Sequence, residues 1–226
     1  HNRVRRQRQM CIRDSSKRTL PAMNSLVVDE DTKLDEHSVI KVKIGREPSR
    51  DLPRLLSILE RSPDCRLRLD GNRLLNLDQV LEVVSCLPQD RIEYVEEPLV
   101  DPARLPELAK VVPVALDESL HDPAASRHED EAGAWVHVIK PTRLGSLEEL
   151  ADEITCARIL QRDVVLTSCF ESPWTLGVLC RVAQEYGLSR AQGLGTSNLY
   201  QDWPRINMAS SLQDVELPEL DWQPWI

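Results

Sequence analysis

Two lysines lie two residues apart in the otherwise apolar stretch of residues 39–45 (VIKVKIG). Its β-branched residues and closing glycine predict a buried strand, and the two-residue period of a strand puts Lys41 and Lys43 on one face. Because neighbouring ammonium groups repel and burial disfavours charge, such a pair is expected to have lowered pKa values. A lysine of this kind serves as a base near neutral pH. The alternative is an edge strand whose lysines reach solvent.

Three acidic residues, Asp70, Glu96 and Asp117, end apolar stretches further along the chain. Three converging carboxylates repel one another unless they become protonated or share a cation. An all-oxygen ligand set without His or Cys favours Mg²⁺, with Mn²⁺ as a substitute. The alternative, that each acid caps the loop after it, explains one acid better than three. Glu97 and Glu118 are expected to point to the opposite faces and to pair with basic neighbours.

Lys140 ends another apolar stretch, after Asp117, whereas Lys41 and Lys43 come before Asp70. A cation held by the acids would therefore lie between lysines on opposite walls of one site. A divalent ion that holds a carboxylate beside a base suits the removal of a proton α to that carboxylate, because the ion stabilises the enediolate that forms.

The ends of the strand-like stretches recur at a regular interval. Successive residue numbers differ by 27, 26, 21, 23, 28 and 27 along the series Lys43, Asp70, Glu96, Asp117, Lys140, Ser168 and Gly195. With a further strand at 22–28, this repeat predicts an α/β fold of the TIM-like (β/α)₈ barrel type, in the form (β/α)₇β. A doubly wound open sheet is less favoured, because no G-x-G-x-x-G or Walker loop follows any strand. In a barrel, all these strand ends face one mouth.

Helices are expected between the strands. The first opens with Asp51 as its cap and Pro53 in its first turn, and Ser146 begins another with a capping box. Gly187 ends the last one. The expected ranges are 51–60, 77–87, 103–111, a weak polar helix at 124–131, 146–160 and 173–186. The tail carries Trp203, Trp222 and Trp225, which are expected to cover apolar surface.

The composition narrows the class of protein. The chain has 226 residues, 41% of them hydrophobic, with a net charge of −9, which fits one domain and gives no basic stripe for nucleic acid. No apolar run is long enough to cross a membrane, and the six cysteines form no C-x-x-C pair, so we expect reduced thiols in a cytoplasmic protein. Residues 1–17 are basic and aperiodic, and residues 10–15 resemble a translated sequencing adapter. We therefore expect a non-native or chimeric lead at 1–17 and a barrel domain over 18–226.

Ordered motifs carry a resemblance to a known family. They are Lys41-x-Lys43, Asp70-x-Asn72, Glu96-Glu97-Pro98, Asp117-Glu118-Ser119 and Lys140-Pro141. In order and spacing they resemble the enolase superfamily of muconate-cycloisomerase type. Within it, residues 67–73, 117–120, 138–142, 167–172 and 193–196 are similar to the o-succinylbenzoate synthases of menaquinone biosynthesis. The resemblance covers about residues 20–204.

The resemblance implies a role for each residue. Lys43 would be the base, Lys41 would tune it, and Lys140 would face a small carboxylate substrate from the opposite wall. The implied ligands of Mg²⁺ are Asp70, Glu96 and Asp117. The implied substrate contacts are Arg68, Asn72, Thr167, Ser168, Gly193 and Gly195, although tight packing is an alternative reason for the two glycines.

The implied reaction is that of a lyase, the dehydration of 2-succinyl-6-hydroxy-2,4-cyclohexadiene-1-carboxylate to o-succinylbenzoate. Racemisation of N-succinylamino acids, epimerisation of dipeptides and a non-catalytic barrel stay open as alternatives. A class I aldolase would not need three acids. Superfamily members carry an N-terminal α+β capping domain, and no such domain precedes Leu20. We therefore expect a truncated, poorly active chain, with its oligomeric state left open.

Overall fold

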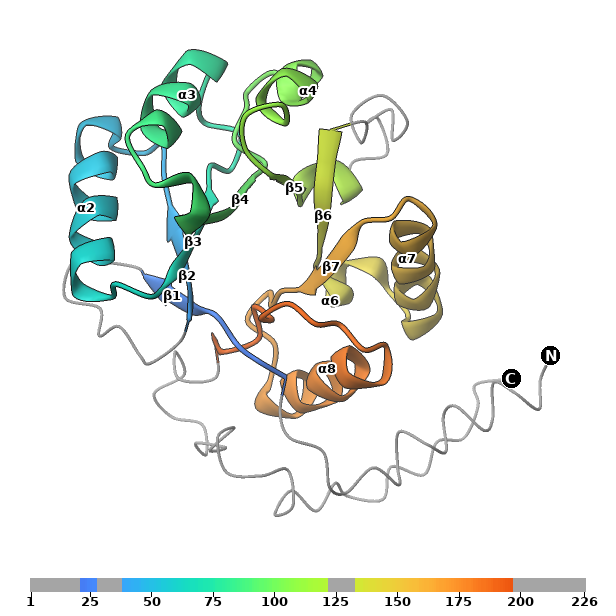
Figure 1. The fold of residues 1–226 in the computed structure, drawn as a ribbon. Helices are drawn as coiled ribbons and strands as arrows, with labels where there is room; N and C mark the ends of the chain where they lie inside the picture. Colours follow the sequence, from blue (N-terminus) through green and yellow to red (C-terminus); the bar gives the residue numbers. More distant parts are fainter. Residues whose placement is uncertain (1–20, 28–37, 122–132, 197–226) are drawn as a thin grey trace, which may run out of the picture.

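The computed structural model describes residues 21–27, 38–121 and 133–196. Within these ranges, seven strands form one parallel sheet in which the spatial order follows the chain order. The strands are β1 (Ser25–Val27), β2 (Val39–Lys43), β3 (Arg66–Asp70), β4 (Ile92–Glu96), β5 (Val114–Leu116), β6 (Ala134–Ile139) and β7 (Asp163–Leu166). Figure 1 looks along the axis of the curled sheet, which the helices surround. The unbroken order confirms the barrel architecture over the doubly wound sheet, whose strand order would reverse.

The segment that was predicted as a last strand, 191–196, contributes two isolated bridges. Gly193 pairs in parallel with Thr167 after β7, and Gln192 pairs in parallel with Met23 before β1. The segment thus lies between the first and last strands of the sheet. Gly193 packs closely against Thr167, because a Cβ atom there would lie 2.6 Å from Thr167 Oγ1. Glycine weakens a strand, which accounts for bridges in place of a full ladder.

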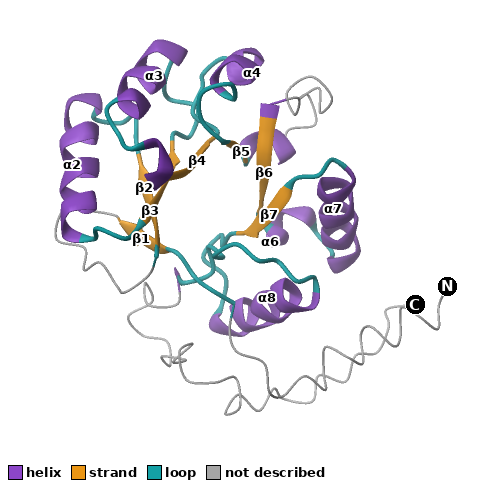
Figure 2. Ribbon diagram, viewed as in Figure 1, coloured by secondary structure: helices purple, strands orange, loops and turns teal. Residues whose placement is uncertain are grey.

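Helices connect the strands on the outside of the ring (Figure 2). They are α2 (Pro48–Arg61), α3 (Leu77–Ser85), α4 (Leu105–Leu108), α6 (Pro141–Leu144), α7 (Leu147–Ile159) and α8 (Pro173–Glu185). Short 3₁₀ turns are η1 (Gln89–Arg91), η2 (Pro102–Arg104) and η3 (Glu118–His121). The Ser146 hydroxyl accepts a hydrogen bond from the Glu149 amide, which confirms the predicted cap of α7.

Two helix predictions need correction, and one short helix was not predicted. Helix α2 begins at Pro48, whose fixed φ suits a first helical position, so Asp51 lies inside the helix and is not its cap. The region 103–111 divides between η2 and α4. The turn α6 was not predicted, because four residues are too few for a periodic pattern. The helix expected at 124–131, the lead at 1–17 and the tryptophans at 203, 222 and 225 lie outside the described residues.

Apolar side chains form two separate clusters. The larger one lies between the sheet and the helices. The smaller one contains Tyr94, Ala115, Val136, Val138 and Val165. Alternate residues of a strand face opposite sides, so Val136 and Val138 share their face with Lys140, and Ala115 shares its face with Asp117. The smaller cluster therefore fills the inside of the ring beneath the mouth.

Two expectations on composition bear on the described part of the chain. Its cysteines, Cys65, Cys86, Cys156, Cys169 and Cys180, are free thiols. None of the helices in the described ranges has the length and apolar character that crossing a membrane requires.

Candidate active site

The register of the strands brings the predicted site residues to one level. Lys43 on β2 is the pairing partner of Asp70 on β3, and Asp70 is the partner of Glu96 on β4. Glu96 in turn pairs with Ala115 on β5. Asp117 comes two residues later, directly after β5, so it continues the face of Ala115. The three acids therefore lie side by side at the carboxyl ends of adjacent strands, where barrel active sites are found.

Lys41 is held between two of these acids. Its ammonium nitrogen lies 2.7 Å from Glu96 Oε1 and 2.9 Å from Asp70 Oδ2. Burial lowers the pKa of Lys41, but the charges of Glu96 and Asp70 outweigh burial and raise the pKa well above its usual value. The expected lowering is thus wrong for Lys41, because its nearest charged partners are carboxylates from β3 and β4.

Lys140 forms an ion pair with the third acid, Asp117. It follows β6, is partly buried, and donates a hydrogen bond from its ammonium group to Asp117 Oδ2. The two lysines contact different acids from different sides, because β2 and β6 flank the three acid-bearing strands in the sheet order. The predicted placement of lysines on opposite walls agrees with this geometry.

The acids are crowded and incompletely satisfied. Burial raises the pKa of Glu96 to about 8; Lys41 opposes this rise, and repulsion from Asp70 and Asp117 adds to it. Burial, followed by the charge of Asp117, also raises the pKa of Glu118. Within the described part of the chain, Glu96 Oε2, Asp117 Oδ1 and Glu118 Oε2 are buried and accept no hydrogen bond. The cluster thus keeps buried acceptor oxygens that its two lysines do not engage.

These observations test whether a divalent cation suits the site. Among the described residues, no three His, Cys, Asp or Glu side chains are arranged closely enough to surround a metal ion. Lys41 instead pairs with Asp70 and Glu96 together, and Lys140 pairs with Asp117. The donor set nevertheless fits Mg²⁺, because all donors are carboxylate oxygens and two of them, on Glu96 and Asp117, are buried without a partner.

The backbone around Lys43 is fixed from helix α2. Asp51 Oδ2 accepts a hydrogen bond from the Gly45 amide over 2.6 Å, and Asp51 Oδ1 pairs with Arg54 at 3.1 Å. The Arg54 guanidinium also donates to the carbonyl oxygen of Lys43, whose own side chain is exposed. Sequence reasoning missed this role of Asp51 and Arg54. Their i, i+3 spacing in the first turns of the helix after Lys43 was the available signal.

Arg68 has partners inside the ring. Its guanidinium forms two hydrogen bonds with Glu93, of 3.0 and 3.1 Å, and one of 3.3 Å with Asn24. It also lies over the Tyr94 ring at 4.9 Å from the ring centre. Arg190 reaches Glu93 as well, at 2.7 Å. The substrate contact expected for Arg68 stays a prediction, and in the described structure its side chain is fully buried within this network.

The other predicted contacts lie on mouth loops. Asn72 donates to Glu118 Oε1 over 3.3 Å, so the segments after β3 and β5 are joined. Thr167 and Ser168 follow β7 and are half-buried, and the Ser168 hydroxyl lies 2.6 Å from that of Thr196. Gly195 is exposed beside Thr196. Their roles towards a substrate stay predictions.

The parallel strands, the surrounding helices and the charged residues at the mouth place this chain among the α/β barrel proteins. The chain belongs to the Enolase C-terminal domain-like family, which matches residues 27–210. This match confirms the resemblance inferred from the motifs.

Curated relatives narrow the comparison. The chain is 36% identical over 177 residues to o-succinylbenzoate synthase of Enterobacter sp. (strain 638), which covers 74% of this chain and 55% of the relative. It is 34% identical to the synthase of Haemophilus influenzae and 35% identical to that of Escherichia coli strain K12. These matches cover 77% and 81% of this chain, and 56% and 59% of the relatives. The chain thus spans somewhat more than half the length of these proteins.

Solved structures agree on the fold. Muconate cycloisomerase from Pseudomonas fluorescens superposes with a TM-score of 0.71 at 20% identity, covering 86% of this chain and 59% of that one. A mandelate racemase/muconate lactonizing enzyme from Roseiflexus sp. gives 0.69 at 24% identity, covering 81% and 57%.

Proposed function

We propose that this chain carries the barrel of a Mg²⁺-dependent carbon–oxygen lyase that converts 2-succinyl-6-hydroxy-2,4-cyclohexadiene-1-carboxylate to o-succinylbenzoate in menaquinone biosynthesis. The observation that carries the proposal is the contact of Lys41 and Lys140 with three acids from adjacent strands at one mouth. The relatives named o-succinylbenzoate synthase support this choice of substrate.

The proposed chemistry assigns one role to each lysine. Lys43, exposed at the end of β2, takes the proton α to the substrate carboxylate. The resulting ammonium then gives a proton to the departing hydroxyl, which leaves as water, so Lys43 returns to its starting state. Lys140 supplies a fixed positive charge from the other wall. Formation of an aromatic ring makes the elimination favourable.

The three acids would hold the divalent ion. When bound, Mg²⁺ supplies positive charge that stabilises the negative charge developing on the substrate carboxylate. Arg54 and Asp51 keep the backbone of Lys43 in place while the proton moves. Because Lys41 already pairs with Asp70 and Glu96, the ion would have to compete with Lys41 for these acids. This competition can be tested.

Product formation by the Mg²⁺-loaded chain, together with exchange of the substrate α-proton in D₂O, tests the assignment of Lys43. A positioned base contributes roughly 10²- to 10⁴-fold to the rate, so we expect Lys43→Ala to lose both dehydration and exchange by that factor. Lys140→Arg keeps the charge and should retain part of the exchange. Lys110→Ala, which changes an exposed lysine away from the mouth, is the matched control and should behave as the unchanged chain.

Two outcomes would contradict the proposal. Undiminished dehydration by Lys43→Ala would remove Lys43 from the reaction. Racemisation of N-succinylamino acids without dehydration of the cyclohexadiene acid would replace the lyase by the racemase alternative, in which Lys43 and Lys140 each exchange a proton on one face of the substrate.

A further inference from the structure

The buried carboxylate of Glu97, next to Glu96, binds two neighbouring segments of the mouth. Its Oε2 accepts hydrogen bonds from the backbone amides of Asp117, at 3.1 Å, and Ser119, at 3.2 Å. Its Oε1 accepts from the Ser119 hydroxyl at 2.7 Å and from Arg73 Nε at 3.0 Å. One side chain at the end of β4 thus holds both the loop after β5 and the segment after β3.

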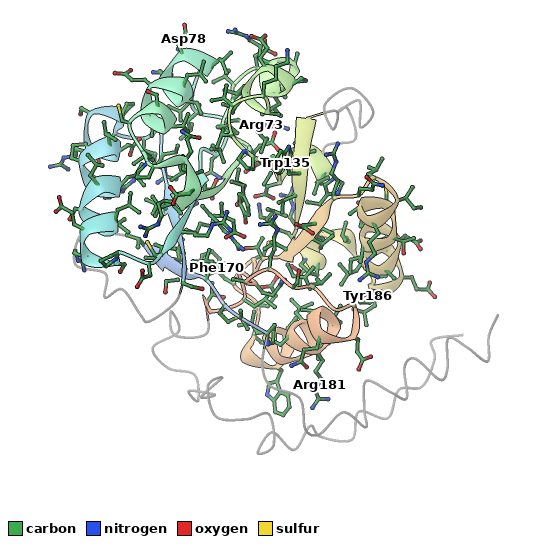
Figure 3. The ribbon with its side chains drawn as sticks, viewed as in Figure 1. Arg73, Asp78, Trp135, Phe170, Arg181 and Tyr186 are labelled. Atoms are coloured by element: carbon green, nitrogen blue, oxygen red, sulfur yellow. The ribbon has the colours of Figure 1, made fainter. Side chains whose placement is uncertain are left out.

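Arg73 completes this connection from the other side. Its guanidinium donates to the Ser119 hydroxyl at 2.7 Å, and its backbone amide donates to the Glu97 carbonyl at 2.7 Å. Arg73 is labelled in Figure 3, which shows the surrounding side chains. We call Arg73, Glu97 and Ser119 the loop clasp.

The loop clasp holds strained backbone. Arg73 has φ 56° and Glu97 has φ 36°, a left-handed region that is unfavourable for a non-glycine residue. Such conformations persist only where the surroundings over-determine them, and strain of this kind gathers at functional sites. Here the hydrogen bonds among the three clasp residues hold the backbone in this conformation.

Each clasp residue lies within three positions of a proposed metal ligand. Arg73 follows Asp70, Glu97 follows Glu96 directly, and Ser119 follows Asp117. We propose that Glu97 is a positioning residue for the divalent site: by binding the amide of Asp117 and the guanidinium of Arg73, it sets how far apart the three ligands lie. This proposal rests on the proposed function, since it assumes that the acids share an ion.

Loss of a residue that hydrogen-bonds and orients a metal ligand typically weakens metal binding by about 10- to 100-fold. A residue that merely supports the fold would change stability without this effect. Glu93 offers the comparison, because it is a similarly buried carboxylate paired with an arginine. Its hydrogen bonds go to the side chains of Arg68 and Arg190, whereas those of Glu97 go to the loops after β3 and β5.

The experiment measures Mn²⁺ binding to the whole chain by the electron paramagnetic resonance signal of free and bound Mn²⁺, alongside thermal unfolding. We expect Glu97→Gln to bind Mn²⁺ about 10-fold or more weakly, and Ser119→Ala to weaken binding less, in the same direction. Glu93→Gln should keep the affinity of the unchanged chain even though it loses stability.

Other results would overturn the proposal. One is a folded Glu97→Gln chain with unchanged Mn²⁺ affinity, and another is an equal loss of affinity in Glu93→Gln. If Glu97→Gln does not fold, Ser119→Ala decides: weaker binding supports the proposal and unchanged binding overturns it. An unchanged chain that binds no Mn²⁺ would overturn the metal-dependent function itself, and the positioning role with it.

Discussion

The ammonium nitrogen of Lys41 lies 2.7 Å from Glu96 Oε1, although the two residues come from strands that are not neighbours. Strand β3 runs between them, and its Asp70 accepts the same ammonium group at 2.9 Å. Lys41 therefore places one positive charge where two carboxylates converge. A divalent ion at these acids would have to compete with Lys41 for the same oxygens, which gives the lysine a measurable effect on metal binding.

Replacing Lys41 by methionine removes the positive charge beside Asp70 and Glu96, and added Mg²⁺ should then supply it. Without metal, Lys41→Met leaves Asp70 and Glu96 buried without their counter-charge, which commonly costs about 3–5 kcal/mol. Added Mg²⁺ should then raise the melting temperature of the variant more than that of the unchanged chain, because no ammonium group competes with it. Thermal unfolding with and without Mg²⁺ measures both effects.

Lys110→Met is the control for that measurement, since Lys110 is exposed. It should match the unchanged chain both in stability and in its response to Mg²⁺. A Lys41→Met chain that gains no more from Mg²⁺ than the unchanged chain would show that the lysine and the ion do not compete for these acids.

The sequence predicted that the site residues lie together at the carboxyl ends of the strands. Charged residues that end apolar, β-branched stretches at a constant interval must meet at one mouth once the stretches form a parallel barrel. The sequence period also predicts that Lys41 and Lys43 share a face. These arguments need only the spacing of residues along the chain, which is why the fold class and the placement of the acids and lysines at one mouth could be predicted.

The pairing of the charges could not be predicted in this way. Whether Lys41 lies closest to another lysine or to Glu96 depends on distances across two strands, and this reversed the expected sign of its pKa shift. The position of Glu97 depends on a left-handed backbone that breaks the alternation of the strand. The pairing of Arg68 with Glu93 depends on a shift in the strand register between β3 and β4. Residue spacing along the chain does not reveal this shift.

The Arg68–Glu93 pair predicts a dependence of stability on pH. Burial would raise the pKa of Glu93, but the hydrogen bonds and charges of Arg68 and then Arg190 outweigh it and lower the pKa. A carboxyl group with a lowered folded-state pKa stabilises the fold fully above its unfolded-state pKa, about 4.3. This contribution disappears as the pH falls through the folded-state pKa.

Glu93→Gln should therefore be less stable than the unchanged chain near neutral pH, by about 3–5 kcal/mol for a broken buried pair. The difference should shrink as the pH falls below about 4. Urea unfolding of both chains across this range measures it. A difference that stays constant with pH would mean that the glutamate does not contribute through its charge.

A close backbone approach supports the last prediction. Gly71 follows Asp70, and a Cβ atom built on it would lie 2.5 Å from Cα of Pro98. The same two segments are joined by hydrogen bonds from the Gly71 amide to the Glu96 carbonyl, at 3.0 Å, and from the Leu75 amide to the Pro98 carbonyl, at 3.0 Å. Because the obstacle is backbone, it cannot turn aside as a side chain would.

Gly71→Ala should thus push apart the segments after β3 and β4, at a cost of about 1–3 kcal/mol for overpacking. Gly177→Ala is the matched control: this glycine lies in α8, and its Cβ would meet nothing within 4 Å. There alanine should stabilise the chain by about 0.5–1 kcal/mol, because glycine is a poor helix residue. Urea unfolding of the two variants should therefore shift in opposite directions. Equal stability of Gly71→Ala and the unchanged chain would mean that the two mouth segments can separate freely, and that their spacing is set elsewhere.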